Sequence, residues 1–226
     1  GVFHVAQLAW LAGLVVPAAV RSALLPVLGA ARHRPTHHRR EMHTAMDLCF
    51  GLLPFGLFGG YLIMRIFAPL AFPAEYLDGT HGASAVDVFT VLLAGWGLTL
   101  LATPTYTSLM AGPYPWRFTL FILLVLTAAV VLGYTLIVLG PDQPGHRLYA
   151  AAVASSLSAG VLLLLSWRMS GGMDFVRERQ DDWALALLGG GFVVIGLISG
   201  THWWLLGLPL FLFTRRGWQA VRATLD

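Results

Sequence analysis

The chain has 226 residues, of which 57% are hydrophobic and only 11% are charged. An average soluble domain carries about a quarter charged residues, so this composition excludes a soluble globular domain and indicates an integral membrane protein. Because one helical crossing of the hydrocarbon core needs about 20 residues, the chain has room for about six or seven crossings and little else.

The basic residues number 14, all of them arginine, and the formal net charge is +3. They cluster between the apolar runs, a distribution that indicates membrane orientation and not nucleic-acid binding. Cys49 is the only cysteine, and its apolar surroundings predict a core-filling role. No group of His and Cys residues has metal-ligand spacing, so we expect neither a metal nor another cofactor.

Seven apolar segments predict an all-α, polytopic transmembrane bundle. The first five are clear, whereas the last two could instead form one broken helix. The segments are Val2 to Leu28, Thr44 to Met64, Val86 to Thr103, Phe118 to Leu139, Leu148 to Ser166, Trp183 to Ser199, and His202 to Phe213.

The placement of arginine favours seven crossings. With seven, Arg147 alone lies in a loop on one side, and the opposite side gathers Arg32, Arg34, Arg39, Arg40, Arg117, Arg168, Arg177, Arg179, Arg215, Arg216 and Arg222. By the positive-inside rule the crowded side is cytoplasmic, so Gly1 is expected outside and Asp226 inside. The charged stretch from Gly171 to Asp182 is predicted to be a cytoplasmic linker containing a short interfacial helix.

Four charged residues lie in the predicted spans or directly at their ends: Arg21, Asp47, Arg65 and Asp87. A charge at the centre of a span costs about 3 kcal/mol on insertion scales, so each is a candidate functional residue. Arg21 and Asp47 are symmetric about the basic turn, and Arg65 and Asp87 are symmetric about Tyr76. We therefore expect each pair at one depth on adjacent antiparallel helices.

These pairs have two interpretations. In the first, they are structural ion pairs between helices, or each side chain snorkels separately to the interface. In the second, Arg21 and Arg65 face a polar cavity and bind an anionic headgroup, because guanidinium offers a planar fork of donors to phosphate. Asp47 and Asp87 are then ion-pair partners or coupling sites.

Prolines and hydroxyl side chains mark two further features of the spans. Pro17, Pro54 and Pro104 each remove a backbone hydrogen bond, so we expect bent helices at these positions. The hydroxyls between Thr99 and Ser108 either line an aqueous vestibule or bond their own backbone carbonyls.

Several short motifs resemble those of one transporter family. They are Gly1-Val-Phe-His-Val-Ala6, Pro17, Leu24-Leu25-Pro26-Val27-Leu28 with the basic turn after it, Pro54, Ala68-Pro69, Phe72-Pro-Ala-Glu-Tyr76 and Leu109-Met110-Ala111-Gly112. In them the chain resembles, over Gly1 to Arg168, the carboxy-terminal half of polysaccharide flippases of the multidrug/oligosaccharidyl-lipid/polysaccharide exporter superfamily. It departs from that pattern in lacking a glycine before Tyr76 and in beginning its fifth segment Leu148-Tyr149-Ala150-Ala151.

The resemblance implies the second lobe of a two-lobed transporter of the bacterial inner membrane, whose amino-terminal helices would precede the printed chain. It implies a cavity for an undecaprenyl-pyrophosphate-linked glycan, which is moved by alternating access without covalent chemistry. Its partners would be membrane lipid and this glycan. Residues 1–226 then form one transmembrane domain: a lobe (1–168), a linker (169–182), and an extra hairpin with a cytoplasmic tail (183–226).

Two other functions stay open. A drug/cation antiporter of the same fold would couple transport through Asp47 or Asp87 and would favour an acidic and aromatic lining. A membrane-embedded enzyme of envelope polysaccharide synthesis would need a long exoplasmic loop, whereas no such loop here exceeds about a dozen residues. We expect a transporter and assign no catalytic residue.

Overall fold

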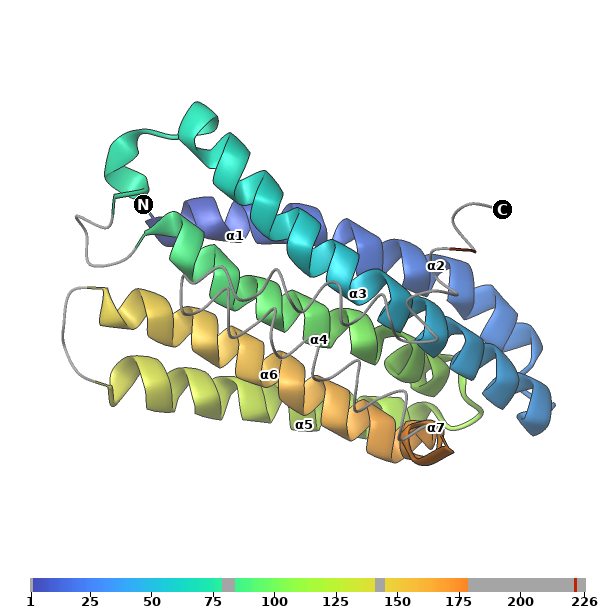
Figure 1. Cartoon of the computed structure of the whole chain (residues 1–226). Helices are drawn as coiled ribbons and strands as arrows, with labels where there is room; N and C mark the ends of the chain where they lie inside the picture. Colours follow the sequence, from blue (N-terminus) through green and yellow to red (C-terminus); the bar gives the residue numbers. More distant parts are fainter. Residues whose placement is uncertain (1, 79–83, 141–144, 179–221, 223–226) are drawn as a thin grey trace.

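The structure is a computed structural model that describes residues 2–78, 84–140, 145–178 and 222 (Figure 1). These residues are helical, and no strand occurs among them. Five of the described segments are long and apolar enough to cross a membrane. The predicted helical class is thereby confirmed, and the first five predicted segments are helices with the length and composition of membrane spans. The predicted spans Trp183 to Ser199 and His202 to Phe213 lie outside the described residues.

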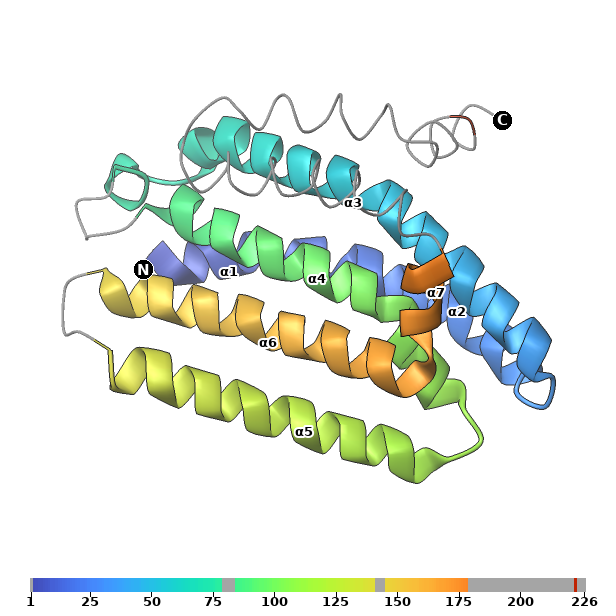
Figure 2. The same cartoon turned by 60° about the horizontal axis from the view of Figure 1, so that its bottom comes forward.

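The five spans comprise six long helices; a short helix follows the second span, another ends the fourth, and a third follows the fifth. In chain order the elements are α1 (Val2–Gly13), α2 (Val15–Ala30), α3 (Pro35–Ala71), the 3₁₀ turn η1 (Ala74–Tyr76), α4 (Ala85–Ala111), α5 (Pro115–Gly133), the π-helical turn η2 (Tyr134–Val138), α6 (His146–Ser170) and α7 (Gly172–Glu178). Successive spans run in opposite directions (Figures 1 and 2).

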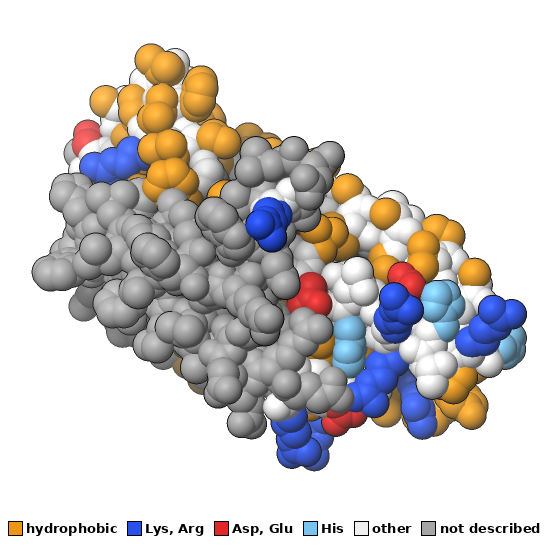
Figure 3. Space-filling model, turned by 45° about the vertical axis from the view of Figure 1, so that its right-hand side comes forward, with side chains coloured by type: hydrophobic (Ala, Val, Ile, Leu, Met, Phe, Trp, Pro, Cys, Tyr) orange, Lys and Arg blue, Asp and Glu red, His pale blue; other side chains and the backbone are white. Residues whose placement is uncertain are grey.

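Because the spans alternate, the α2–α3, α4–α5 and α6–α7 turns gather at one end of the bundle (Figure 2). We call this the basic end, because its turns and adjacent helix ends carry Arg32, Arg34, Arg39, Arg40, Arg117, Arg168 and Arg177. Figure 3 shows arginine and histidine side chains gathered there. The opposite end holds the start of α1, the end of α3 and the starts of α4 and α6.

Helix α4 is the centre of the bundle. It contacts α1, α2, α3, α5 and α6, and 67% of its most apolar stretch is buried. The core around it includes Val88, Leu92, Trp96 and the fully buried Cys49, which agrees with the core-filling role predicted for this cysteine. Helix α5 lies at the edge beyond α6 (Figure 2), with only 6% of its stretch buried, as expected for a lipid-facing helix.

The first predicted span is divided into two helices. Pro17 has no backbone N–H, so it cannot bond the carbonyl of Gly13 four residues earlier. Helix α1 ends at Gly13, and α2 begins at Val15 after the single turn residue Leu14. The bend predicted at Pro17 is therefore confirmed as a break, whereas α3 and α4 continue as helix through residues 54 and 104.

Helix α3 extends further at both ends than the apolar segment Thr44 to Met64. It has 37 residues, which at 1.5 Å per residue is roughly 55 Å and exceeds the ~30 Å hydrocarbon core. Pro35 starts the helix, because its fixed φ suits the first helical position. Hydropathy marks only the part that lipid surrounds, so the polar first turns were missed.

Candidate functional site

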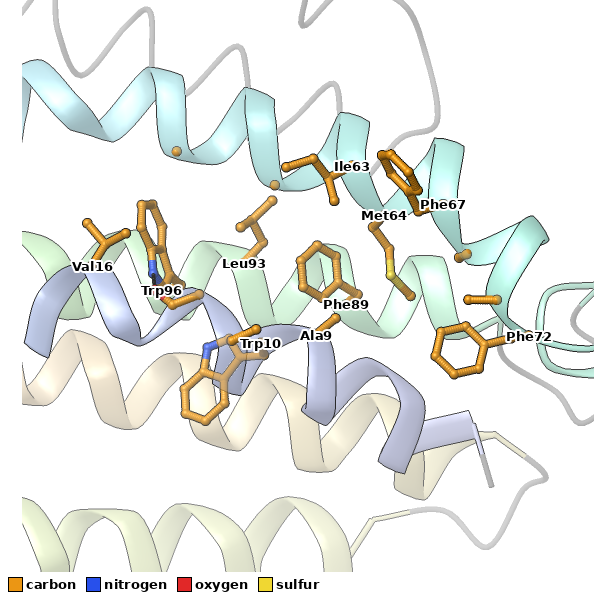
Figure 4. Close-up of a pocket in the computed structure, with 16 residues that line it drawn as sticks. Ala9, Trp10, Val16, Ile63, Met64, Phe67, Phe72, Phe89, Leu93 and Trp96 are labelled. Atoms are coloured by element: carbon orange, nitrogen blue, oxygen red, sulfur yellow. Dashed lines mark hydrogen bonds between the residues drawn. The ribbon is translucent and has the colours of Figure 1, made fainter.

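A pocket of about 470 Å³ lies between α1 and α3, above α4 (Figure 4). We call it the apolar pocket, because among the described residues only glycine, alanine and larger hydrophobic side chains line it. Its larger lining residues include Trp10, Ile63, Met64, Phe67, Phe89 and Trp96. A lining of this kind suits a hydrocarbon chain.

Trp96 fixes one end of the apolar pocket to the break in the first span. Its indole Nε1–H donates to the Gly13 carbonyl at 2.8 Å, which is the carbonyl that Pro17 leaves without a helical donor. The side chain of Trp96 is only 4% exposed. An unpaired buried carbonyl would cost about 1–3 kcal/mol, so α4 stabilises the broken helix through this bond.

Two glycines of α3 allow α4 to approach closely. A Cβ atom at Gly56 would overlap the six-membered ring of Trp96, and one at Gly60 would lie 2.9 Å from Leu93 Cδ1. The spacing of four residues places both glycines on one face of α3, as in small-residue helix contacts of membrane proteins. Glycine at position 56 is therefore required by the position of the Trp96 ring.

Trp10 offers a hydrogen-bond donor beside the apolar pocket. Its Nε1 atom is buried, and within the described part of the chain it has no hydrogen-bond partner. Because leaving a buried donor unmade costs free energy, an oxygen of a bound amphiphile would be favoured at this atom.

The predicted site residues Arg21 and Arg65 lie elsewhere on the bundle. Arg21 is exposed on α2, and Arg65 is exposed on α3, where it donates to the Tyr61 hydroxyl at 3.1 Å. Neither lines the apolar pocket. Asp47 is half-buried on α3. The pairing of the two arginines with Asp47 and Asp87, and their binding of substrate, stay predictions.

Asp87 lies in the first turn of α4, a position that favours a carboxylate in any helix. Its backbone N–H donates to Ser84 Oγ at 3.2 Å, so Ser84 and Asp87 are the N-cap and N3 residues. The carboxylate also faces the positive end of the helix dipole and accepts from the Tyr149 hydroxyl at 3.4 Å.

The hydroxyl-rich end of α4 does not line a vestibule in this conformation. Thr103, Thr105 and Thr107 are fully buried. Thr103 and Thr107 donate to carbonyls one turn earlier, and Thr105 also pairs with Ser166 Oγ on α6 at 2.8 Å. Backbone bonding, one of the two interpretations of these hydroxyls, is what the structure contains.

A second pocket, of about 290 Å³, lies at the basic end. We call it the basic pocket. Its polar lining comes from Arg32, His38, Arg39, Ser170 and Asp174. We expected these arginines only to orient the protein, because hydropathy does not show that three turns distant in sequence meet in space.

The comparisons with known proteins add no relative: no family model, no curated protein and no solved structure matches the chain. The fold defines the protein as a multi-pass helical membrane protein with an apolar pocket between two of its spans.

Proposed function

We propose that the protein belongs to a transporter that moves a lipid-linked oligosaccharide, of the undecaprenyl-pyrophosphate type, across the bacterial inner membrane. The observation that supports this proposal most is the apolar pocket between α1 and α3. Its volume of about 470 Å³ falls within the ~300–1,000 Å³ of ordinary ligand pockets. A hydrocarbon tail gains free energy in such a pocket only by fitting its walls, since lipid outside is equally apolar.

Movement would use the break between α1 and α2. Because Pro17 removes the hydrogen bond to the Gly13 carbonyl, fewer helical bonds hold the angle between α1 and α2 at Leu14 than elsewhere in the span. The bond from Trp96 to the Gly13 carbonyl holds α1 against α4. Breaking that bond and swinging α1 would widen the apolar pocket, as alternating access requires.

The charged headgroup would be held by Arg21 or Arg65. Each presents an exposed guanidinium at a membrane-spanning helix, where an unpaired charge is costly and a bidentate phosphate contact is favourable. The oligosaccharide, the pyrophosphate and the amino-terminal helices of a first lobe enter this proposal through the motif resemblance.

The lining of the apolar pocket argues against the drug/cation antiporter. That function needs an acidic group near the substrate, whereas the described residues that line this pocket include no aspartate or glutamate. Asp87 has a capping role instead. No observation favours an enzyme of polysaccharide synthesis over a transporter.

A pocket-filling substitution tests the proposal. Ala12 is exposed on α1 and lines the apolar pocket, whereas Ala19 is equally exposed on α2 and does not line it. In proteoliposomes that contain a fluorescent undecaprenyl-pyrophosphate oligosaccharide, we expect Ala12→Phe to slow flipping about tenfold, because overfilling a packed site costs about 1–3 kcal/mol. Ala19→Phe should flip at nearly the wild-type rate. Equal rates for Ala12→Phe and wild type would refute the role of the pocket.

A further inference from the structure

The basic pocket brings together three turns that are far apart in the sequence. Arg32 and Pro35 come from the α2–α3 turn and the start of α3, Pro113 from the α4–α5 turn, and Ser170 and Gly171 from the α6–α7 turn. Figure 3 shows this end as a concentration of arginine and histidine side chains. A polar pocket of about 290 Å³ is large enough for a phosphate group.

His38 fixes the first turns of α3 beside this pocket. Its Nδ1 lies 3.2 Å from the Leu28 carbonyl at the end of α2, and its Nε2 lies 2.8 Å from Ser108 Oγ on α4. Both ring nitrogens are thus engaged within the protein. His38 is therefore a positioning residue, and Arg32 and Arg39 are the cationic side chains that line the pocket.

The start of α3 carries charge of the wrong sign for a helix amino terminus. Arg34 at the N-cap makes no side-chain capping bond, and the first turn contains no acidic residue. The amino terminus of a helix has a partial positive charge and N–H groups without helical partners, so anions stabilise it and cations do not. Here Arg32, Arg34, Arg39 and Arg40 lie close to it in the sequence instead, and an anion beside Arg32 and Arg39 would relieve this repulsion.

The carboxylate of Asp174 already pairs with one arginine of the basic pocket. An Asp174 carboxylate oxygen lies 3.5 Å from Arg39 Nη2, and the two side chains are 54% and 48% exposed. Exposed pairs of this kind contribute little to stability, so a phosphate can compete with the carboxylate for Arg39.

We infer that the basic pocket binds a phosphate group, carried by a lipid headgroup at the membrane surface or by a free phosphate compound. Arg32 and Arg39 contact the phosphate oxygens, and Asp174 opposes binding. This inference does not depend on the proposed transport of a lipid-linked oligosaccharide, since it concerns another pocket and other residues.

The experiment uses the whole chain in detergent micelles at constant ionic strength. One arm titrates inorganic phosphate by calorimetry against chloride, and the other counts bound phosphatidic acid against phosphatidylcholine by native mass spectrometry.

We expect Arg32→Gln to lower the affinity for phosphate about tenfold, since a hydrogen bond to a charged group is worth about that factor. Arg117→Gln removes the same charge at the same end, but Arg117 packs on Tyr114 and Trp116 and does not line the pocket; it should leave affinity within about twofold.

Asp174→Asn supplies a test in the opposite direction. It should raise affinity at least about threefold, because it removes the competing carboxylate. An effect of Arg32→Gln confined to the phosphatidic acid arm identifies a lipid headgroup, and one confined to inorganic phosphate identifies a free phosphate compound. Equal losses in Arg32→Gln and Arg117→Gln, or no binding above the chloride and phosphatidylcholine controls, would overturn the inference.

Discussion

The two pockets differ in the way that the two parts of an amphiphile differ. The apolar pocket lies between helices beside the centre of the bundle and has no charged lining. The basic pocket lies where turns meet at one end and contains two arginines, a histidine and an aspartate. Closely packed helices therefore form the pocket that suits a hydrocarbon chain, and converging turns form the pocket that suits a phosphate.

The two pockets should also be sensitive to different kinds of substitution. Rigid contacts between α1, α3 and α4 shape the apolar pocket, so changes of volume matter most there. Exposed charges shape the basic pocket, so changes of charge should alter binding with little effect on folding. If the two pockets respond independently in this way, substitutions at them should differ widely in their effect on the free energy of unfolding.

The largest effect is expected at Gly56. Because a Cβ atom there would overlap the Trp96 ring, Gly56→Ala should lower the free energy of unfolding by about 2–3 kcal/mol, measured by denaturant titration in micelles. Gly59 in the same helix has open space at its Cβ position, so Gly59→Ala should be neutral or stabilising by up to about 1 kcal/mol. Phosphate binding at the basic end should survive in both variants, and its loss in Gly56→Ala would contradict the separation.

The next effect concerns the bond between Trp96 and Gly13. Trp96→Phe keeps an aromatic ring but leaves the Gly13 carbonyl without its donor, at a cost of about 1–3 kcal/mol. Amide hydrogen exchange should become faster in α1 and stay unchanged in α6. Trp116→Phe is the control, because Trp116 is 60% exposed on α5. Uniform acceleration throughout the bundle would show that Trp96 supports the whole core and does not specifically hold α1.

A smaller effect is expected at the cap of α4. Ser84→Ala removes the side-chain acceptor of the Asp87 N–H and should cost about 1 kcal/mol, as typical N-caps do. Asp87→Asn should cost about 0.3–1 kcal/mol through the helix dipole. Both variants should still flip the oligosaccharide in proteoliposomes. Loss of flipping in a stably folded Asp87→Asn protein would restore the coupling role for this carboxylate.

The smallest effect on stability is expected at Asp174. Because its pair with Arg39 is about half exposed, Asp174→Asn should change the free energy of unfolding by less than about 0.5 kcal/mol. A loss above about 2 kcal/mol would mean that this pair is a structural link and not an exchangeable contact.

Hydropathy predicts the spans of this protein well because lipid requires every spanning segment to satisfy its own backbone, as a helix does. It predicted five of the helical segments now described, and Pro17 predicted a bend close to the point where α1 ends and α2 begins. It could not predict that α3 continues through its polar first turns, since those turns lie outside the apolar part.

The site was less accessible from the sequence than the fold. The apolar pocket is built from residue types that fill any membrane core, and only the glycine spacing of Gly56 and Gly60 hints at it. Asp87 was treated as a buried charge, although Ser84 three residues earlier carries a capping signal. The basic pocket depends on the convergence of three turns, which single-sequence reasoning does not give.

Photo-crosslinking tests the central claim most directly, namely that the pocket between α1 and α3 holds the hydrocarbon chain of the substrate. An undecaprenyl lipid with a diazirine in its chain is irradiated in proteoliposomes, and the labelled peptides are identified by mass spectrometry. We expect labelling of α3 at Ile63 and Phe67 and of the part of α1 that faces them. Excess unlabelled polyprenyl lipid should remove this labelling, whereas phosphatidylcholine should not. Helix α5 exposes as much apolar surface to lipid, so labelling spread evenly over α5 and the pocket would contradict the claim.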